Sequence, residues 1–527
     1  MAITGTRART DVRGACAGRV RRKFSSDAFG ILRQVACGAL VAFAASVHAE
    51  TWRFEPWLNV EETLTNNVNL EPNATRRGDL VSQLTPGFRV TETGAHTSLV
   101  GSVSLPILLY ARTGSENNSV EPYVNLLGTW ELVEHFFFID GSANVNQQYL
   151  TPFGARSDSL ANATNNRFTA QTYQVSPYIK GDTTDYSYIL RDNNIWTKGN
   201  ASIVTGAYTN DLIGTLRRDP RPLGWAVDID RTATTFQDQS QQLLELARVR
   251  GLYRVDAQVE LSASGGFEHN DLLLESKDDV IYGVGIKWRP TERANVEASW
   301  EHRFFGASYN VVVENRTPLS VWSLIASRNI TTYPQQLAAL PGGIGVANAL
   351  DQLFLSRVPD QTARQALINQ LILDRGLPAF LSNGVNIYSQ QVTLQESLVA
   401  TAGLLGARNS VFFSVYRLRQ EPISGSGIVL PDILGTFQNN TQYGANVVWS
   451  YSLTPLMTLT SSVDASRTVD NAQPGTTRQG SIRAAITSRV APFTDIYGGI
   501  RYQVSRSNVS SDYDEAAVFV GVNHRFH

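Results

Sequence analysis

The sequence predicts an all-β protein: a transmembrane antiparallel β-barrel of about 22 strands, within a range of roughly 20 to 24. Three observations predict this fold. Apolar and polar side chains alternate along many short segments, which gives each strand one lipid-facing and one lumen-facing side. Tight turns alternate with longer polar loops between those segments. The hydrophobic fraction is an ordinary 42%, and no stretch after residue 50 has the roughly 18 unbroken apolar residues of a spanning helix.

Residues 1–49 have the features of a signal peptide. They contain a basic region that includes Arg21 and Arg22, an apolar core from Val35 to Ser46, and a small-residue cleavage site ending at Ala49. We therefore expect cleavage before Glu50 and a mature barrel over residues 50–527.

The charge and cysteine content of the mature chain restrict its chemistry. The leader holds 8 of the 45 basic residues and 2 of the 47 acidic residues, so 37 basic and 45 acidic residues remain and the net charge is −8. This balance gives no reason to expect a nucleic-acid partner. Both cysteines, Cys16 and Cys37, lie in the leader, so we expect no disulfide, thiolate metal site or cysteine nucleophile in the mature protein.

The mature chain is predicted to begin with an aromatic-rich strand over residues 52–60. A series of hairpins follows, each marked by alternating side chains around a turn. The polar stretch 151–166, rich in Asn, Ser and Ala, is predicted to be a surface loop between two of these hairpins. The expected strands of this half cover residues 79–91, 97–112, 119–130, 136–149, 168–179, 185–197, 204–216, 223–236, 241–250 and 254–268.

The hairpin over residues 279–305 has the clearest alternation. Val280, Tyr282 and Trp288 fall on its lipid side, and Trp288 lies near the turn, where an interfacial aromatic belt is expected. The charged side chains of this hairpin form either a hydrated wall that guides a polar polymer or solute, or an ion-pair network that stabilises the interior. The expected lumen-lining residues are Lys287, Arg289, Glu297, Glu301 and Arg303.

The last three strands, within residues 479–526, repeat this design. Ile482, Ile500 and Val520 fall on the lipid side. Arginines on the opposite side would favour acidic sugars or lipopolysaccharide phosphates if they are exposed, whereas pairing with lumen carboxylates is the structural alternative. These lumen-lining candidates are Arg483, Arg489, Arg501 and Arg525.

One segment departs from the strand pattern. Residues 331–389 are too long for a hairpin connection and have helical spacing. Two short amphipathic helices, the second capped by Asp360, predict a helical hairpin insert over residues 340–380, and chain parity assigns it to an extracellular connection. It is predicted to be a plug in the lumen, a lid above it or a decoration of the loop, and barrels of this width are usually plugged. The plug or lid candidates are Leu350, Leu353, Phe354, Asp360, Leu367 and Leu371.

Around residues 411–418 the alternation weakens, because apolar residues fall on both faces of the expected strand. Either a β-bulge or a lumen side that is covered by protein explains this pattern.

Histidines and carboxylates give little support for catalysis. No pair of histidines has metal-ligand spacing, so we expect no metal site and no cofactor. A barrel hydrolase needs a Ser/His or Asp/His constellation that faces the rim or the lipid. His269 beside Asp271 and Asp278 is the nearest candidate, and a solvated loop cluster is the favoured alternative. We expect no catalytic residues and a protein that is not an enzyme.

Several motifs recur in a known family of barrels. They include Trp288-Arg289-Pro290-Thr291, Arg303-Phe304-Phe305-Gly306, Val358-Pro359-Asp360 and Gly376-Leu377-Pro378. With these motifs the chain resembles the outer-membrane barrels encoded with the PEP-CTERM/exosortase system in bacteria that make exopolysaccharide, and the resemblance spans most of the mature chain. It implies an outer-membrane location and an association with exopolysaccharide export or surface sorting, and it implies no established activity.

These observations predict a monomeric, passive pore in the outer membrane of a Gram-negative bacterium. The expected partners are outer-membrane lipid and lipopolysaccharide, the barrel-assembly machinery and, by the resemblance, exopolysaccharide and periplasmic export components. A barrel that anchors or receives surface material without transporting it is the main alternative, and a barrel hydrolase is the third.

Overall fold

The computed structural model of the chain describes residues 51–526, apart from residues 238–240, 273–275, 340–345, 355–357, 359–363, 365–366, 369–370, 373–380, 382–383, 386–387 and 424–437. The predicted signal peptide (residues 1–49) and the predicted helix cap Asp360 lie outside the described residues.

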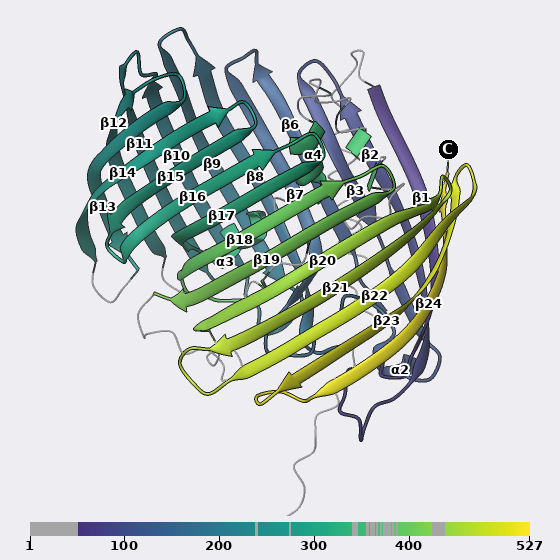
Figure 1. Cartoon of the computed structure of the whole chain (residues 1–527). Helices are drawn as coiled ribbons and strands as arrows, with labels where there is room; N and C mark the ends of the chain where they lie inside the picture. Colours follow the sequence, from purple (N-terminus) through teal and green to yellow (C-terminus); the bar gives the residue numbers. More distant parts are fainter. Residues whose placement is uncertain are drawn as a thin grey trace, which may run out of the picture. The chain divides into compact units, whose positions relative to one another are not determined.

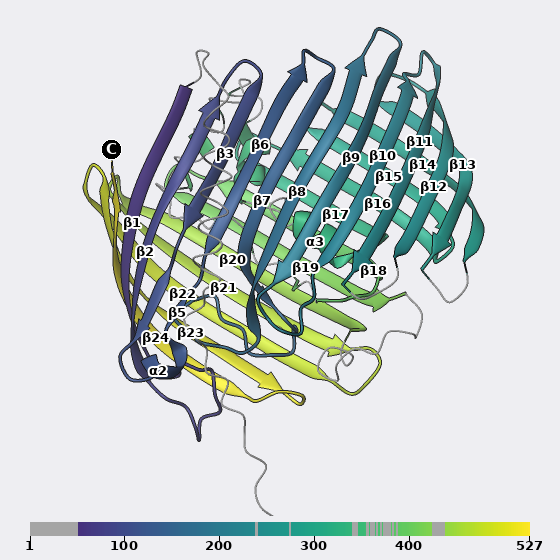
Figure 2. The ribbon, with the colours of Figure 1, turned by 180° about the vertical axis from the view of Figure 1, so that it is seen from behind.

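All strands of the described chain belong to one antiparallel sheet that closes on itself (Figures 1 and 2). The bounds of the first half are β1 (Thr51–Thr65), β2 (Asp79–Thr93), β3 (Thr97–Ser104), β4 (Ile107–Tyr110), β5 (Ser119–Val120), β6 (Tyr123–Val133), β7 (Phe137–Tyr149), β8 (Arg167–Asp182), β9 (Tyr186–Gly199), β10 (Ala207–Arg218), β11 (Leu223–Phe236) and β12 (Gln242–Arg254). Those of the second half are β13 (Val259–Asp271), β14 (Lys277–Thr291), β15 (Ala294–Arg303), β16 (Gly306–Arg316), β17 (Ser320–Thr331), β18 (Thr393–Leu405), β19 (Asn409–Pro422), β20 (Asn440–Thr454), β21 (Met457–Asp470), β22 (Thr476–Ala491), β23 (Thr494–Ser507) and β24 (Tyr513–Arg525).

The first and last strands close the barrel. β1 pairs with β24 from Trp57 opposite Arg525 to Thr65 opposite Ala517. Every strand edge in this wall therefore finds hydrogen-bond partners, which is the condition for crossing a lipid bilayer with strands.

Two adjacent barrel strands are interrupted at prolines. β3 and β4 both pair with β2 and are separated at Pro106, while β5 and β6 pair with β4 and β3 and are separated at Pro122. Proline has no N–H to donate to the ladder. When each interrupted pair is counted as one strand, the 24 segments of the described chain form a barrel of 22 strands. The predicted fold class is therefore confirmed.

The structure gives bounds for the helices α2 (Gly114–Asn117), α3 (Tyr333–Ala339) and α4 (Val346–Phe354). The described residues Arg364, Leu367, Ile368, Leu371 and Ile372 are helical as well. Both α3 and α4 belong to the connection between β17 and β18, residues 332–392, which we call the insert. No described helix has the length and apolar character needed to cross a bilayer.

The two ends of the barrel differ. One end carries the first residues of β1, the last residues of β24 and short turns such as residues 94–96, 292–293 and 492–493. The other end carries longer connections, among them residues 66–78, 150–166 and the insert. This asymmetry is typical of outer-membrane barrels, whose short turns face the periplasm.

The two faces of the wall also differ, as the alternation predicts. Phe413 is 41% exposed on the outside, whereas its neighbour Phe412 is 1% exposed on the inside. Other exposed apolar side chains of the outer face include Val280, Val284, Ile482, Ile500, Val518 and Val520. An apolar band of this kind is what lipid requires.

Candidate functional site

The insert turns into the lumen and first contacts the far wall. Thr332 caps α3, because its Oγ1 accepts from the N–H of Gln335 at 3.4 Å and its own N–H donates to Gln335 Oε1 at 3.0 Å. Tyr333 and Leu337 of α3 then share a buried cluster with Phe168 of β8, although β8 and β17 are far apart in the sheet order. The insert therefore bridges the lumen.

The helix α4 packs on an apolar stretch of the inner wall. Val346 and Leu350 are buried in one cluster with three inward-facing side chains, Val321 of β17, Phe412 of β19 and Val448 of β20. Leu405, at the end of β18 beside a short turn, packs against the same cluster. Because this turn belongs to the end opposite the insert's entry, α4 lies deep inside the barrel.

The predicted plug residues share this environment where the structure describes them. Leu353 and Phe354 of α4 are buried in the cluster, and Leu367 and Leu371 pack against it. Ile368 joins them with no exposed surface. The helical residues of the insert thus present their apolar side chains to the barrel wall.

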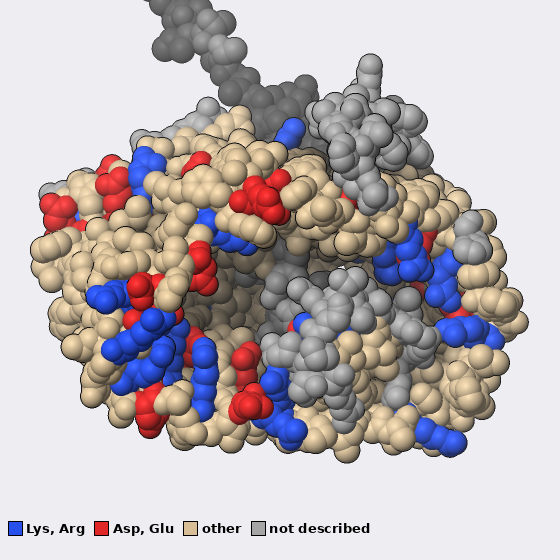
Figure 3. Space-filling model, turned by 90° about the horizontal axis from the view of Figure 1, so that it is seen from above, with Lys and Arg blue, Asp and Glu red and all other residues tan. Residues whose placement is uncertain are grey.

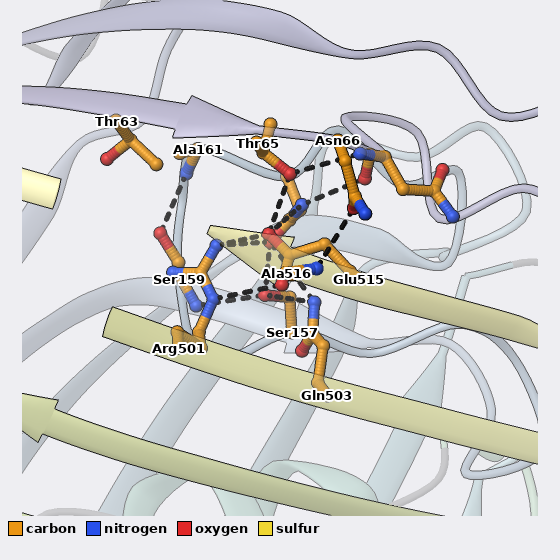
Figure 4. Close-up of polar contacts among 12 residues, drawn as sticks. Thr63, Thr65, Asn66, Ser157, Ser159, Ala161, Arg501, Gln503, Glu515 and Ala516 are labelled. Carbon is orange, nitrogen blue, oxygen red and sulfur yellow. Dashed lines mark hydrogen bonds and ion pairs between the residues drawn. The ribbon is translucent and has the colours of Figure 1, made fainter. Parts of the chain in front are cut away.

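A second segment also folds inward: residues 150–166, which we call the latch loop. Its contacts to β23 and β24 are mostly polar (Figure 4). Arg501 donates to Glu515 Oε1 at 2.8 Å and to Asn162 Oδ1 at 3.0 Å. Thr65 donates to Glu515 at 2.7 Å, and Glu515 has no exposed surface. Since Thr65 and Glu515 lie on β1 and β24, the latch loop is tied to the strands that close the barrel.

The prediction that residues 151–166 form a surface loop is wrong. Ala161 and Asn162 are almost completely buried, and Ser157 is buried beside Gln503. Their polar groups are satisfied by the inner wall and by the loop itself instead of by bulk water, and amino-acid composition does not distinguish these two environments.

A cavity of about 530 Å³ remains in the lumen, and we call it the lumen cavity. It lies against β10–β12 and β15–β17, and Thr332, Gln335 and Val392 of the insert complete its wall. A smaller cavity of about 200 Å³ lies between the latch loop and β19–β23. Seen from above, the barrel is hollowed, and side chains of both charges gather on the wall of the hollow (Figure 3).

An ion-pair network crosses the lumen cavity. Arg248 of β12 donates to Asp228 of β11 at 3.0 Å and to Glu301 of β15 at 2.7 Å. Arg250 donates to both oxygens of Asp228, at 2.6 and 2.8 Å. Such a two-point contact fixes the guanidinium firmly. Through Arg248 and Glu301 the network joins β12 and β15, which are three positions apart in the sheet.

The charged residues predicted on β14 and β15 fall into two groups. Glu301 and Arg303 line the lumen cavity, and Arg303 pairs with the fully buried Glu268 at 2.7 Å. Lys287 lies opposite Glu297 in the strand register, and Arg289 lies 3.9 Å from Glu297. These last three side chains lie near the short-turn end and do not line the lumen cavity.

The four arginines of the last strands contact carboxylates or a ring. Arg501 pairs with Glu515, while Arg489 and Arg525 lie 3.5 and 3.1 Å from Asp495. Arg483 lies over the ring of Phe519 at 4.4 Å. Three of these guanidinium groups are therefore engaged with carboxylates, as the structural alternative for this set expected.

His269 lies on the outer face near the long-loop end. Its Nδ1 is 2.7 Å from Asp278 and its Nε2 is 3.3 Å from Ser276 Oγ. The side chain of Asp278 is 87% exposed, so water competes for its charge. This serine–histidine–carboxylate chain matches the connectivity of a hydrolase triad in a solvated setting.

Comparisons with known proteins give no family. No family model matches the chain, and no curated protein matches its sequence. Among solved structures, the siderophore receptor PirA from Acinetobacter baumannii superposes with a TM-score of 0.47 at 9% identity, covering 90% of this chain and 80% of that one. The unliganded ferric citrate transporter FecA gives 0.47 at 10% identity, with 90% and 78% covered. Pseudomonas aeruginosa OccK1 (OpdK) gives 0.34 at 8% identity, with 90% and 99% covered.

Sequence reasoning missed several residues of this site. Asp228 and Asp230 lie on one face of β11, and Arg248 and Arg250 lie on one face of β12, with Asp228 directly opposite Arg248. The period-two spacing of each pair was a usable signal. The helix α3 was also missed, although the sequence Thr332-Tyr333-Pro334-Gln335 matches a capping box.

Proposed function

We propose that the protein is a passive outer-membrane conduit whose lumen is closed by the insert. The observation that carries this proposal is the burial of α4 against Val321, Phe412 and Val448 on the inner wall. A wall that only faced water would not need apolar side chains at these positions. Movement of the insert away from this seat would join the lumen cavity to the rest of the pore.

The outer membrane of a Gram-negative bacterium is the location that this barrel fits. A closed wall with an apolar outer band supports this location. Such barrels reach that membrane unfolded and insert with the barrel-assembly machinery. Arg231 and Glu245, which face outward near the long loops and lie 3.0 Å apart, support contact with lipopolysaccharide. The self-closed sheet of the described chain supports a monomer.

For the cargo, we propose exopolysaccharide or material sorted to the cell surface in a PEP-CTERM-type system. The sequence motifs shared with that family support this proposal, and periplasmic export components would then dock at the short-turn end. Polar side chains along the lumen cavity, such as Thr232 and Asn310, suit a hydroxyl-rich solute because each can donate or accept a hydrogen bond.

Planar-bilayer recordings test the conduit. We expect the intact mature chain to give little current, and a chain without residues 340–380 to give steady conductance that maltodextrin or polygalacturonate oligomers block. Removal of the exposed residues 73–76 from the loop between β1 and β2 is the matched control and leaves the current unchanged. Absence of conductance from both the intact chain and the chain without residues 340–380 contradicts the conduit.

The second candidate function is a barrel that anchors or receives surface material without transport. The latch loop and the insert together support it, because both occupy the lumen and Glu515 ties the latch loop to the barrel closure. The same recordings separate the two functions: an anchor stays silent with or without residues 340–380.

A hydrolase remains the third alternative, and its test is direct. Purified protein is incubated with a fluorogenic phospholipid and a fluorogenic peptide, and compared with the His269→Ala variant. We expect no turnover by either protein, because Asp278 is solvated and solvated charges interact weakly. Turnover that disappears in His269→Ala would establish the enzyme.

A further inference from the structure

Two carboxylates of the lumen cavity have only neutral hydrogen-bond partners. Asp211 accepts from Asn193 at 3.1 Å and from Thr232 at 2.8 Å. Asp230 lies 3.5 Å from the Thr232 hydroxyl. Among the residues that the structure describes, no lysine, arginine or histidine forms an ion pair with either carboxylate. Both line the lumen cavity, so two negative charges there lack a cation.

The arginines nearest to these carboxylates are already engaged. Arg248 and Arg250 bind Asp228 at 3.0 and 2.6 Å. Arg303 binds Glu268 at 2.7 Å. Breaking a buried pair of this kind leaves a charge without its partner and is costly. None of these three arginines therefore forms an ion pair with Asp211 or Asp230.

A third group in the same cavity points to a hydrogen-bond donor. Gln242 is 8% exposed and lines the lumen cavity, and its Oε1 has no hydrogen-bond partner in the described structure. Its Nε2 donates to the carbonyl oxygen of Gln390 at 3.3 Å. This contact fixes the amide orientation, because the reverse orientation would place two oxygens together. A buried acceptor without a donor is unfavourable unless a ligand supplies one.

We propose that the lumen cavity binds a small organic cation with several N–H donors, of the diamine or guanidinium class. Asp211 and Asp230 would accept charge-assisted hydrogen bonds from it, and Gln242 would accept a further one. The cavity volume of about 530 Å³ falls within the usual range for small-molecule sites. This inference goes beyond the proposed conduit, since binding requires no flux.

The insert forms part of this site. Gln335 of α3 lines the cavity and donates to Thr232 Oγ1 at 3.5 Å, and Thr232 in turn contacts Asp211. A cation bound between the wall and α3 thus contacts both, and it stabilises the seated insert by mass action.

Calorimetric titration of the full mature chain, folded in detergent, tests the site with agmatine as the probe. We expect saturable binding of agmatine, no binding of citrate or sucrose, and much weaker binding of Mg²⁺. The double variant Asp211→Asn/Asp230→Asn is expected to weaken agmatine binding by at least about tenfold, because two charge-assisted hydrogen bonds are lost. The control Glu297→Gln, which removes a lumen charge outside the cavity, leaves the affinity unchanged.

A second variant keeps the test decisive if the double variant does not fold. Asp230→Asn alone disturbs one long contact to Thr232 and keeps the hydrogen bonds of Asp211, so we expect a folded barrel with several-fold weaker agmatine binding. Affinity that is unchanged by Asp230→Asn, or Mg²⁺ binding as tight as agmatine binding, overturns the proposal. Calorimetry measures binding independently of conductance. If the bilayer recordings show no current with or without residues 340–380 while agmatine still binds, the conduit is refuted and the site is retained.

Discussion

The insert and the latch loop both fold into the lumen, and opposite forces hold them there. The insert rests on an apolar part of the wall, where Leu350 and Ile368 are buried with Phe412. The latch loop rests on a polar part, where Asn162 meets Arg501 and Glu515. Apolar contact is non-directional and tolerates sliding, whereas buried charged hydrogen bonds require one geometry. The comparison indicates that the insert is the segment suited to move and the latch loop the segment suited to stay.

The largest expected effect follows from placing a charge beneath the insert. Leu350→Asp would bury an unpaired carboxylate in the apolar cluster, which costs several kcal/mol, and the insert would leave its seat. We expect single-channel conductance in planar bilayers to rise several-fold over that of the intact chain. Leu350→Met conserves volume and polarity and serves as the control with unchanged current. Equal currents from both variants would show that α4 does not close the pore.

Substitutions that break the contacts of the latch loop should lower the stability of the barrel and leave its conductance unchanged. Arg501→Met leaves Glu515 buried without its cation, a change that costs about 3–5 kcal/mol. We expect a lower urea midpoint for the loss of the compact barrel band on unheated gels. The double variant Arg501→Met/Glu515→Met should lose less than Arg501→Met alone, because no charge is stranded. A double variant that is less stable than Arg501→Met would contradict the conclusion that the Arg501–Glu515 pair stabilises the seat of the latch loop.

The ion-pair network of the lumen cavity gives a smaller, electrical effect. Asp228→Asn removes the carboxylate that Arg248 and Arg250 share. In the chain without residues 340–380, we expect the reversal potential in a salt gradient to shift toward anion selectivity, because Arg250 loses its counter-charge and Arg248 keeps only Glu301. Glu297→Gln removes one negative charge elsewhere in the lumen and should shift the reversal potential less. Identical shifts would place the conducting path away from Asp228.

The smallest effect is expected near the short-turn end. Arg289 lies 3.9 Å from Glu297 and its side chain is 66% exposed, and exposed pairs of this kind contribute roughly 0–1 kcal/mol. Arg289→Met should therefore leave the urea midpoint unchanged within error. A clear loss would show that this pair belongs to the stabilising network.

The sequence was sufficient to predict the barrel because the alternation of side chains within each strand identifies its lipid-facing and lumen-facing sides. Ile286 and Trp288 alternate with Lys287 and Arg289, and tight turns such as residues 292–293 set the register. The same logic located the insert's seat in part: apolar residues on both faces near Phe412 predicted either a bulge or a lumen side covered by protein, and Phe412 is covered by the insert. Helical spacing likewise predicted the stripe of Leu350 and Leu353 in α4.

The contacts across the lumen were not predictable in this way. Nothing local to Asn162 indicates that it meets Arg501, which lies 339 residues away, because the pairing depends on where the closed wall brings the two segments. Polar loops that are buried and polar loops that are solvated have the same composition, which is why residues 151–166 were assigned to the surface. The cavity formed by Asp211, Asp230 and Gln242 likewise depends on three strands and the insert together.

Cysteine cross-linking tests the seat of the insert most directly, since residues 50–527 contain no cysteine. Leu350→Cys is combined either with Phe412→Cys, which faces inward in the same cluster, or with the neighbouring Phe413→Cys, which faces outward. A short bismaleimide is added to the folded barrel and the peptides are read by mass spectrometry. We expect a cross-link for the pair with position 412 and none for the pair with position 413. A cross-link to position 413, or none to either, would contradict an insert that lies inside the barrel.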